Sequence, residues 1–149
     1  MMKPRRVVHF YPKAFGSAVV GLPWQLAELV ATIENVHPGL RWYVADAQTI
    51  GPFPLSHREP RATLAGDSDA LIRAIARVEQ FESGVFAGVP GELDHPAFRS
   101  GGLWTEDEEK ADLGDAIVEI RAFDTSYWSV GTNDAEILSS VVRRFSEAG

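Results

Sequence analysis

The sequence of 149 residues contains no cysteine. A disulfide framework, thiol catalysis and cysteine-based zinc sites are therefore excluded. Long hydrophobic runs are also missing. The basic start of the chain is followed by only Val7 and Val8 before His9, whereas a signal peptide needs about 7–15 consecutive apolar residues. No segment approaches the roughly 18 apolar residues of a membrane span. These absences predict a cytoplasmic protein with no membrane partner.

The chain has fewer basic than acidic residues. The chain has 14 Lys and Arg against 21 Asp and Glu, which gives a formal net charge of −7. Binding to nucleic acid is driven by Lys and Arg side chains that neutralise phosphates. The composition therefore predicts no nucleic-acid partner.

Motifs that carry catalysis or hold a cofactor are missing as well. The histidines stand at 9, 37, 57 and 95, without the spacing of a zinc motif. The glycines form neither a phosphate loop nor a dinucleotide fingerprint, and no nucleophile elbow occurs. We therefore expect no metal and no cofactor, assign no catalytic residue, and favour a non-catalytic role.

What the chain does have is a concentrated acidic segment between Trp104 and Glu119. Its acids stand at 106, 107, 108, 109, 112, 115 and 119, against one lysine at 110. Such a segment governs solubility, electrostatic steering and the choice of partner. We expect a short helix over 105–112, capped by Thr105. Trp104 is expected to be partly exposed, whereas Trp24 and Trp42 are expected in the core.

The spacing of apolar residues predicts an α+β protein with a single domain over residues 1–149. Helices are expected to begin at Pro23, at Asp67 or Ser68, and at a capping box of Asn133 and Glu136. The predicted strands are 7–11, 40–45, 85–89, 116–123 and 127–132. The order β-α-β-α-β-β-β-α indicates a single mixed β-sheet of about five strands with three α-helices, in which a C-terminal β-hairpin is followed by a helix.

The hairpin has two unlike faces. Val118, Ile120 and Ala122 form one apolar face, while Glu119 and Arg121 point to the other. Burying two ions costs several kcal/mol unless they are paired and fully hydrogen-bonded, so we expect this second face to be open or only partly covered. Trp128 is expected to share it, although a one-residue change of register would move Trp128 to the other side.

These features favour a soluble, non-catalytic protein-binding domain whose partner has a basic surface. Aromatic residues beside an arginine and an acidic rim are typical of interface hot spots. In class alone, and on no particular residue, such a chain is similar to bacterial toxin-neutralising immunity proteins. This similarity implies an acidic immunity-like protein that neutralises a toxin or nuclease. The candidate contact residues are Trp104, Glu106, Asp107, Glu108, Glu109, Glu119, Arg121 and Trp128.

Two alternatives remain open. The segment 46–66 contains three prolines and shows no period, and long loops in compact domains are often functional. A small-ligand-binding or hydrolytic domain would then have its pocket under this loop, at Asp46, His57 and Arg58. In the other alternative, the chain is a homo-oligomeric structural domain that pairs through its hairpin edge.

Overall fold

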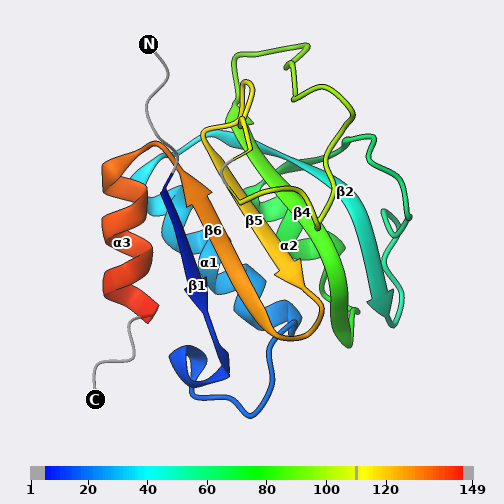
Figure 1. Ribbon diagram of the computed structural model, residues 1–149, viewed down its shortest axis with the longest axis vertical. Helices are drawn as coiled ribbons and strands as arrows, with labels where there is room; N and C mark the ends of the chain where they lie inside the picture. Colours follow the sequence, from blue (N-terminus) through cyan, green and yellow to red (C-terminus); the bar gives the residue numbers. More distant parts are fainter. Residues whose placement is uncertain (1–5, 110, 146–149) are drawn as a thin grey trace.

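The computed structural model describes residues 6–109 and 111–145, and its centre is an antiparallel sheet of six strands (Figure 1). The strands stand in the order β1-β6-β5-β4-β2-β3. Their bounds are β1 Arg6–Phe10, β2 Leu40–Ile50, β3 Thr63–Asp67, β4 Gln80–Pro90, β5 Val118–Phe123 and β6 Tyr127–Thr132. The helices are η1 Pro12–Phe15, a short 3-10 turn, and the α-helices α1 Pro23–Val36, α2 Ser68–Ala74 and α3 Ala135–Phe145.

The predicted α+β class with three α-helices is confirmed, with two corrections to the sheet. It is antiparallel rather than mixed, and it has six strands rather than five. The additional strand is β3, which lies in the segment predicted as a loop over 46–66. The same segment also contributes the end of β2, because β2 continues to Ile50 and pairs with the first half of β4.

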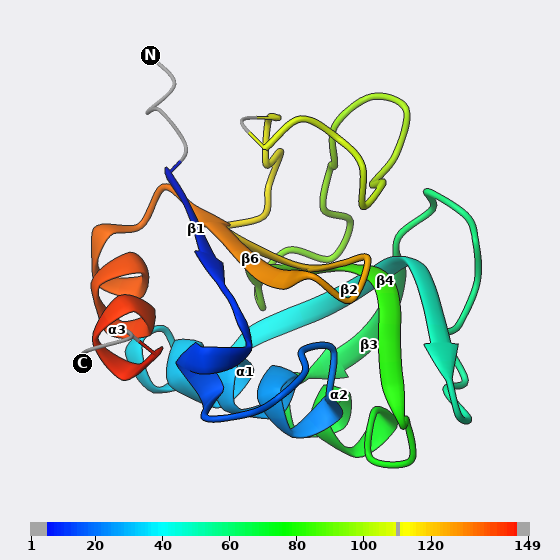
Figure 2. The same cartoon turned by 60° about the horizontal axis from the view of Figure 1, so that its bottom comes forward.

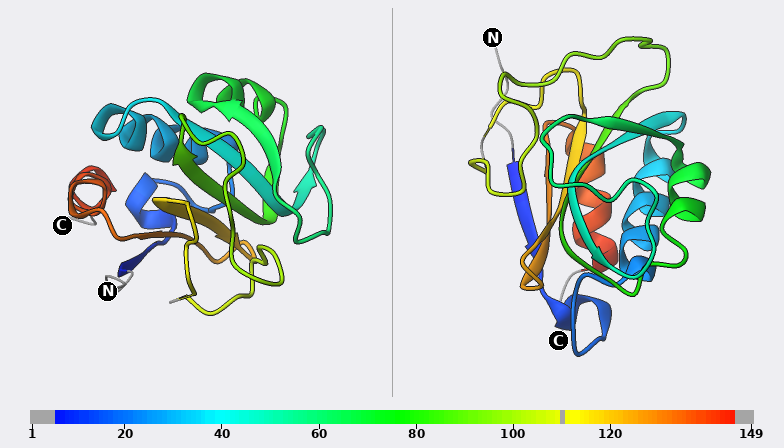
Figure 3. Two further views of the ribbon diagram at one scale, coloured as in Figure 1. Left: turned by 90° about the horizontal axis from the view of Figure 1, so that it is seen from above. Right: turned by 90° about the vertical axis from the view of Figure 1, so that its right-hand side faces the viewer.

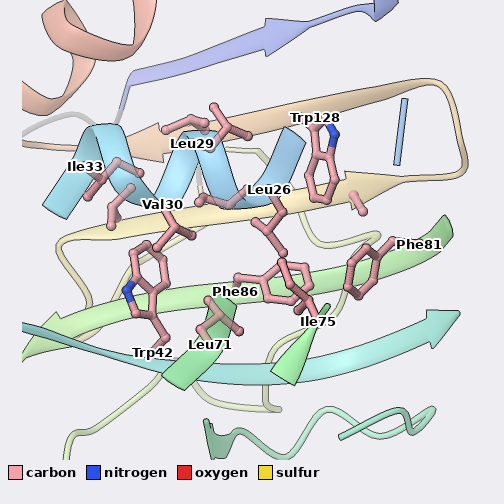
Figure 4. Packing of buried hydrophobic residues seen from close by; sticks show 14 of the residues in the cluster. Leu26, Leu29, Val30, Ile33, Trp42, Leu71, Ile75, Phe81, Phe86 and Trp128 are labelled. Carbon is pink, nitrogen blue, oxygen red and sulfur yellow. The ribbon is translucent and has the colours of Figure 1, made fainter. Parts of the chain in front are cut away.

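The three α-helices lie against one face of the sheet, as the side-on views show (Figures 2 and 3). Between helices and sheet lies the main core, in which Trp42, Phe86 and Trp128 are fully buried (Figure 4). The expectation for Trp42 is therefore confirmed. The expectation for Trp24 is wrong, because this side chain at the start of α1 is 43% exposed. None of the described helices combines the length and the apolar character that a bilayer crossing requires.

The predicted hairpin forms from β5 and β6, with Phe123 opposite Tyr127 across the turn. Its register places Trp128 opposite Ala122, on the helix-covered face. The prediction that Trp128 shares a face with Glu119 and Arg121 is therefore wrong. The helix that follows is capped one residue later than expected, because the Asp134 carboxylate accepts hydrogen bonds from the amides of residues 136 and 137.

The other face of the sheet is covered by the described chain between β4 and β5, residues 91–109 and 111–117, which we call the cover loop (Figures 2 and 3). Leu103, Leu113 and Ala116 of this loop pack against Val85 and other small apolar residues of β2 and β4. The helix predicted over 105–112 is absent from the described part of this segment, which forms turns and irregular chain. Its backbone carbonyls instead accept hydrogen bonds from Arg121 of β5.

Candidate functional site

A buried ionic cluster fastens the cover loop to the centre of the sheet. The Glu119 carboxylate on β5 accepts hydrogen bonds from Arg99 Nη1 at 2.7 Å and from Arg121 Nε at 2.8 Å. Glu119 is 0% exposed and Arg121 is 3% exposed. Because each ion has an oppositely charged partner and further hydrogen bonds, the desolvation cost of burial is offset.

Arg121 also holds the acidic segment in place through its backbone. Its Nη1 donates to the carbonyl oxygens of Asp107, at 2.6 Å, and of Thr105, and its Nη2 donates to the carbonyl oxygen of Glu108. Arg99 adds a side-chain contact, since its Nε donates to Asp107 Oδ2 at 2.8 Å. The guanidinium groups of Arg99 and Arg121 thus hold residues 105–108 of the acidic segment against the sheet.

The electrostatic environment stabilises the charge on Arg99. Burial by itself would lower the pKa of this guanidinium, but the hydrogen bonds and charges of Glu119 and Asp107 outweigh it and raise the pKa above its usual value. Arg99 therefore holds its proton more firmly than an ordinary arginine side chain does.

A bulge in β2 supplies the other wall of the site. The pairing of β2 with β4 shifts between Ala45 and Gln48, and Asp46 within this bulge has a positive φ of 49°. Bulges re-aim side chains, and Asp tolerates this backbone conformation better than most residues. The Asp46 carboxylate thereby accepts a hydrogen bond from the backbone amide of Thr105 at 3.0 Å.

Between the bulge and the acidic segment lies a cleft of about 670 Å³. Two aromatic residues line it, half-buried Phe123 and Trp104, which is 39% exposed. Its charged lining consists of five carboxylates and one guanidinium: Asp46, Glu82, Glu106, Asp107, Asp124 and Arg58. An excess of carboxylates in a concave site concentrates negative potential, which attracts cationic groups.

The carboxylates of the cleft differ in what they already bind. Asp46 and Asp107 accept hydrogen bonds from protein groups. Glu82, Glu106 and Asp124 are exposed, and their side chains make no hydrogen bond or ion pair with any residue that the structure describes. No group of three or more metal-ligating side chains converges among the described residues.

The structure separates the candidate contact residues of the sequence into two sets. Trp104, Glu106 and Asp107 line the cleft, while Glu108 and Glu109 are exposed on the same segment. Glu119, Arg121 and Trp128 are buried. The expectation of an open face around Glu119 and Arg121 is therefore wrong: the loop roofs them, and they support the segment from beneath.

The alternative pocket residues are also divided. Asp46 and Arg58 line the same cleft as Trp104, so the two sites predicted from the sequence share one location. His57 does not line it. Its backbone amide bonds to the carbonyl oxygen of Ala47, and both of its ring nitrogens lie within hydrogen-bond distance of loop carbonyl oxygens, which indicates a structural role within the loop.

Sequence reasoning missed four residues of this site. Arg99 lies in a stretch with no periodic pattern, and Glu82 and Asp124 come from separate strand ends that only the sheet brings together. Thr105 is 3% exposed, and its hydroxyl has no hydrogen-bond partner in the described part of the chain. Twenty residues separate Arg99 from Glu119, and no local spacing could have shown that they pair.

A second contact joins the acidic segment to the edge of the sheet. Glu109 pairs with His9 Nε2 on β1. The His9 ring stacks on Tyr127 with 4.1 Å between ring centroids, and Tyr127 in turn stacks on Phe123 at 5.1 Å. A row of half-buried rings therefore runs from His9 on β1 to Phe123 at the cleft. Glu109 of the acidic segment contacts the His9 end of this row.

No protein-family model matches this chain, and comparison with curated proteins and with solved structures finds no match to either.

Proposed function

We propose that this chain is a protein-binding domain that recognises a partner with a basic surface, most concretely an immunity-like protein that neutralises a toxin or nuclease. The observation that carries the proposal is the cleft, which is lined by half-exposed Trp104 and by carboxylates that bind no residue within 6–109 and 111–145. Aromatic residues set in a charged rim are typical of binding hot spots, and negative potential steers a basic partner toward the site.

The ionic cluster beneath the acidic segment supports the same role. Arg121 binds the backbone of residues 105, 107 and 108, so the rim of the cleft is already ordered before a partner arrives. A rim that is ordered in advance loses little conformational entropy on binding, which improves affinity. The contact residues in this proposal are Trp104, Glu106 and Asp107, together with Glu82 and Asp124.

The proposal is tested by capturing partners from the protein's own cells with two matched double variants. Glu106→Gln with Asp124→Asn removes two carboxylates that line the cleft and bind no other described side chain. Glu92→Gln with Asp94→Asn removes two exposed carboxylates that do not line it. We expect a basic protein that is retained by the wild type and by the second variant and lost with the first.

The captured partner is then purified, and its affinity is measured at two salt concentrations. Raising the salt to about 0.5 M shortens the screening length to a few ångströms, so binding should weaken at least tenfold. A partner that binds both double variants equally, or with an affinity indifferent to salt, would overturn the proposal.

A second candidate function is small-ligand binding, and one observation favours it. The volume of the cleft falls within the range of about 300–1,000 Å³ that is common for ligand sites, and the polar residues Asp46, Arg58 and Thr105 line it together with two aromatic rings. A small cationic molecule that binds tightly in the absence of any protein partner would favour this reading.

A further inference from the structure

We infer that the cleft binds a small molecule with a flat aromatic ring, which stacks on Phe123 and lies over Ser83. This inference rests on small-ligand binding, the second candidate function, and names the chemical class of the ligand. Three observations carry it: a stack of rings that crosses the sheet, the register of the strands, and the residues that line the cleft.

The stack has one ring on each of three neighbouring strands and ends at Phe123. His9 on β1 stacks on Tyr127 of β6 with 4.1 Å between ring centroids and 18° between ring planes. Tyr127 stacks on Phe123 of β5 at 5.1 Å and 9°. The strands β1, β6 and β5 lie side by side, and β4 is the next strand (Figure 1).

The second face of the Phe123 ring is directed toward β4. Phe123 and Tyr127 are directly opposite each other in the sheet, and their centroid distance is close to the spacing of about 4.7–4.9 Å between adjacent strands. The nearly parallel ring planes therefore stand across the direction from strand to strand. Tyr127 covers one face of Phe123, and within the described chain no other ring contacts Phe123.

The next position of this row holds no ring. Ser83 of β4 pairs with Phe123, Gln48 of β2 pairs with Ser83, and all three residues line the cleft of about 670 Å³. Phe123 and Gln48 are thus two strand spacings apart, about 9–10 Å, with only the small side chain of Ser83 between them. Packed ring faces need about 3.5–4 Å on each side, so there is room for one ring.

The floor of this space is fixed by hydrogen bonds. The Ser83 hydroxyl donates to the carbonyl oxygen of Asp46 at 2.9 Å, in the bulge of β2. The Gln48 side-chain oxygen accepts a hydrogen bond from Arg58 Nη2 at 2.7 Å, at the far end of the row. A ring that enters over Ser83 therefore meets a surface that is already ordered, and it continues a stack whose spacing is typical of aromatic pairs.

The charge of the lining selects the substituents of the ring. Asp124 follows Phe123 directly in the chain and lines the cleft, in which five carboxylates stand against one guanidinium. This excess of negative charge repels a ligand that carries a phosphate or carboxylate group. The ligand class is therefore an aromatic ring with amine or amidine N–H groups and no acidic group.

The probe for this inference is benzamidine, titrated into the protein and followed by NMR. We expect saturable shifts at the amides of residues 83 and 123–124 with a dissociation constant of about a millimolar, as is usual for a single small group. The ring protons of benzamidine should move upfield, because they lie against the face of Phe123. The matched control is cyclohexanecarboxamidine, which keeps the charged group and replaces the flat ring by a saturated one. It should bind about threefold to tenfold more weakly.

Two variants test the position of the ring. Ser83→Phe supplies the missing member of the stack from the protein itself, so it should weaken benzamidine binding by at least about tenfold and leave the melting temperature unchanged or higher. Ser139→Phe makes the same change at an exposed site on α3 and should leave binding unchanged. Phe123→Leu removes the ring on which benzamidine stacks and should weaken binding by about threefold to tenfold.

The outcomes separate this inference from the functions on which it builds. Equal binding of benzamidine and cyclohexanecarboxamidine, without upfield shifts, would overturn the stacked ring and leave small-ligand binding standing. Full binding of benzamidine to a folded Ser83→Phe variant would overturn it as well. If neither probe causes saturable shifts, the inference is overturned, whereas a basic partner that is lost with Glu106→Gln and Asp124→Asn would still support protein binding. The two probes need only the wild-type protein, so the test does not depend on the folding of any variant.

Discussion

On one face of the sheet, three helices bury aromatic and aliphatic side chains; on the other, the cover loop buries two guanidinium groups and a carboxylate beside a small apolar cluster. The first layer gains its stability from apolar area removed from water, which needs no particular alignment of groups. The second depends on directed hydrogen bonds among Arg99, Glu119 and Arg121, in which one missing partner leaves the others uncompensated.

This difference explains why the candidate site lies on the loop-covered side. Loops carry binding residues most effectively when a rigid scaffold positions them. Here the helix-covered layer supplies the rigid scaffold. Arg121 of this sheet fixes residues 105–108 by donating hydrogen bonds to the carbonyl oxygens of residues 105, 107 and 108. Residues 105–108 are thus fixed through their backbone, while the side chains of Glu106 and Glu108 remain exposed.

The largest loss of stability is expected from a substitution that leaves a cavity in the helix-covered layer. Phe86 is fully buried and packs against the rings of Phe81 and Trp128. Phe86→Ala should lower the free energy of unfolding by about 3–5 kcal/mol, as measured by urea denaturation. Phe123→Ala, at the half-exposed edge of the other face, should cost about 1 kcal/mol. Equal losses would show that the two faces do not differ in this way.

The next largest effect is expected from the ionic cluster. Glu119→Gln leaves the guanidinium groups of Arg99 and Arg121 buried without their shared carboxylate, so unfolding should become easier by about 3 kcal/mol. Hydrogen exchange should also accelerate at the amides of Leu103 and Thr105, which anchor the cover loop to Pro60 and Asp46.

The matched control for this variant is the exposed ion pair of Glu28 and Arg144, whose nitrogen and oxygen atoms are 3.6 Å apart. Glu28→Gln makes the same chemical change at the helix surface and should cost about 0–1 kcal/mol. A cost at Glu119 no greater than that at Glu28, with the cover loop still protected, would mean that the cluster does not hold the loop.

The sequence was sufficient for the hairpin and for the three α-helices, because these depend on local periodicity, but it also predicted a helix over 105–112 that the described residues of this segment do not form. The strand predicted over 116–123 and the turn at Asp124 anticipated β5 and β6, and the apolar spacing after Pro23 predicted α1. β3 escaped prediction because its five residues include glycine and only one large apolar side chain, Leu64, which is exposed. An edge strand of this kind is defined by its partner β2 rather than by its own pattern.

The candidate site was only half predictable for a different physical reason. Glu119 and Arg121 were identified correctly as unusual residues in a strand, but their burial depends on Arg99, which lies in an irregular segment 20 residues earlier. An open face was expected because no partner for these two ions is visible in the neighbouring sequence. Asp46 and Trp104 were assigned to separate sites, and only the bulge in β2 and the path of the cover loop bring them to one cleft.

The smallest expected effect concerns the edge at which the acidic segment meets the sheet. Burial, together with the charge of Glu109 and the neighbouring Tyr11, raises the pKa of Tyr127 above its usual value, although Arg121 opposes this shift. A phenol with a raised pKa favours folding fully below the ordinary value, and this contribution is lost as the pH rises through the raised one. The contribution of Tyr127 to stability should therefore be lost only in strongly alkaline solution.

Absorbance titration of the phenolate measures this shift, with Tyr127→Phe subtracted to isolate one of the three tyrosines. The midpoint for Tyr127 should lie above about 10, the ordinary value for tyrosine. Glu109→Gln should lower the midpoint because it removes the nearby negative charge. The control Glu108→Gln changes an exposed neighbouring carboxylate that does not raise the pKa of Tyr127, so it should leave the midpoint unchanged. A midpoint that is insensitive to Glu109 would mean that the acidic segment does not rest on this edge in solution, and the ordered rim of the cleft would then end at Glu108.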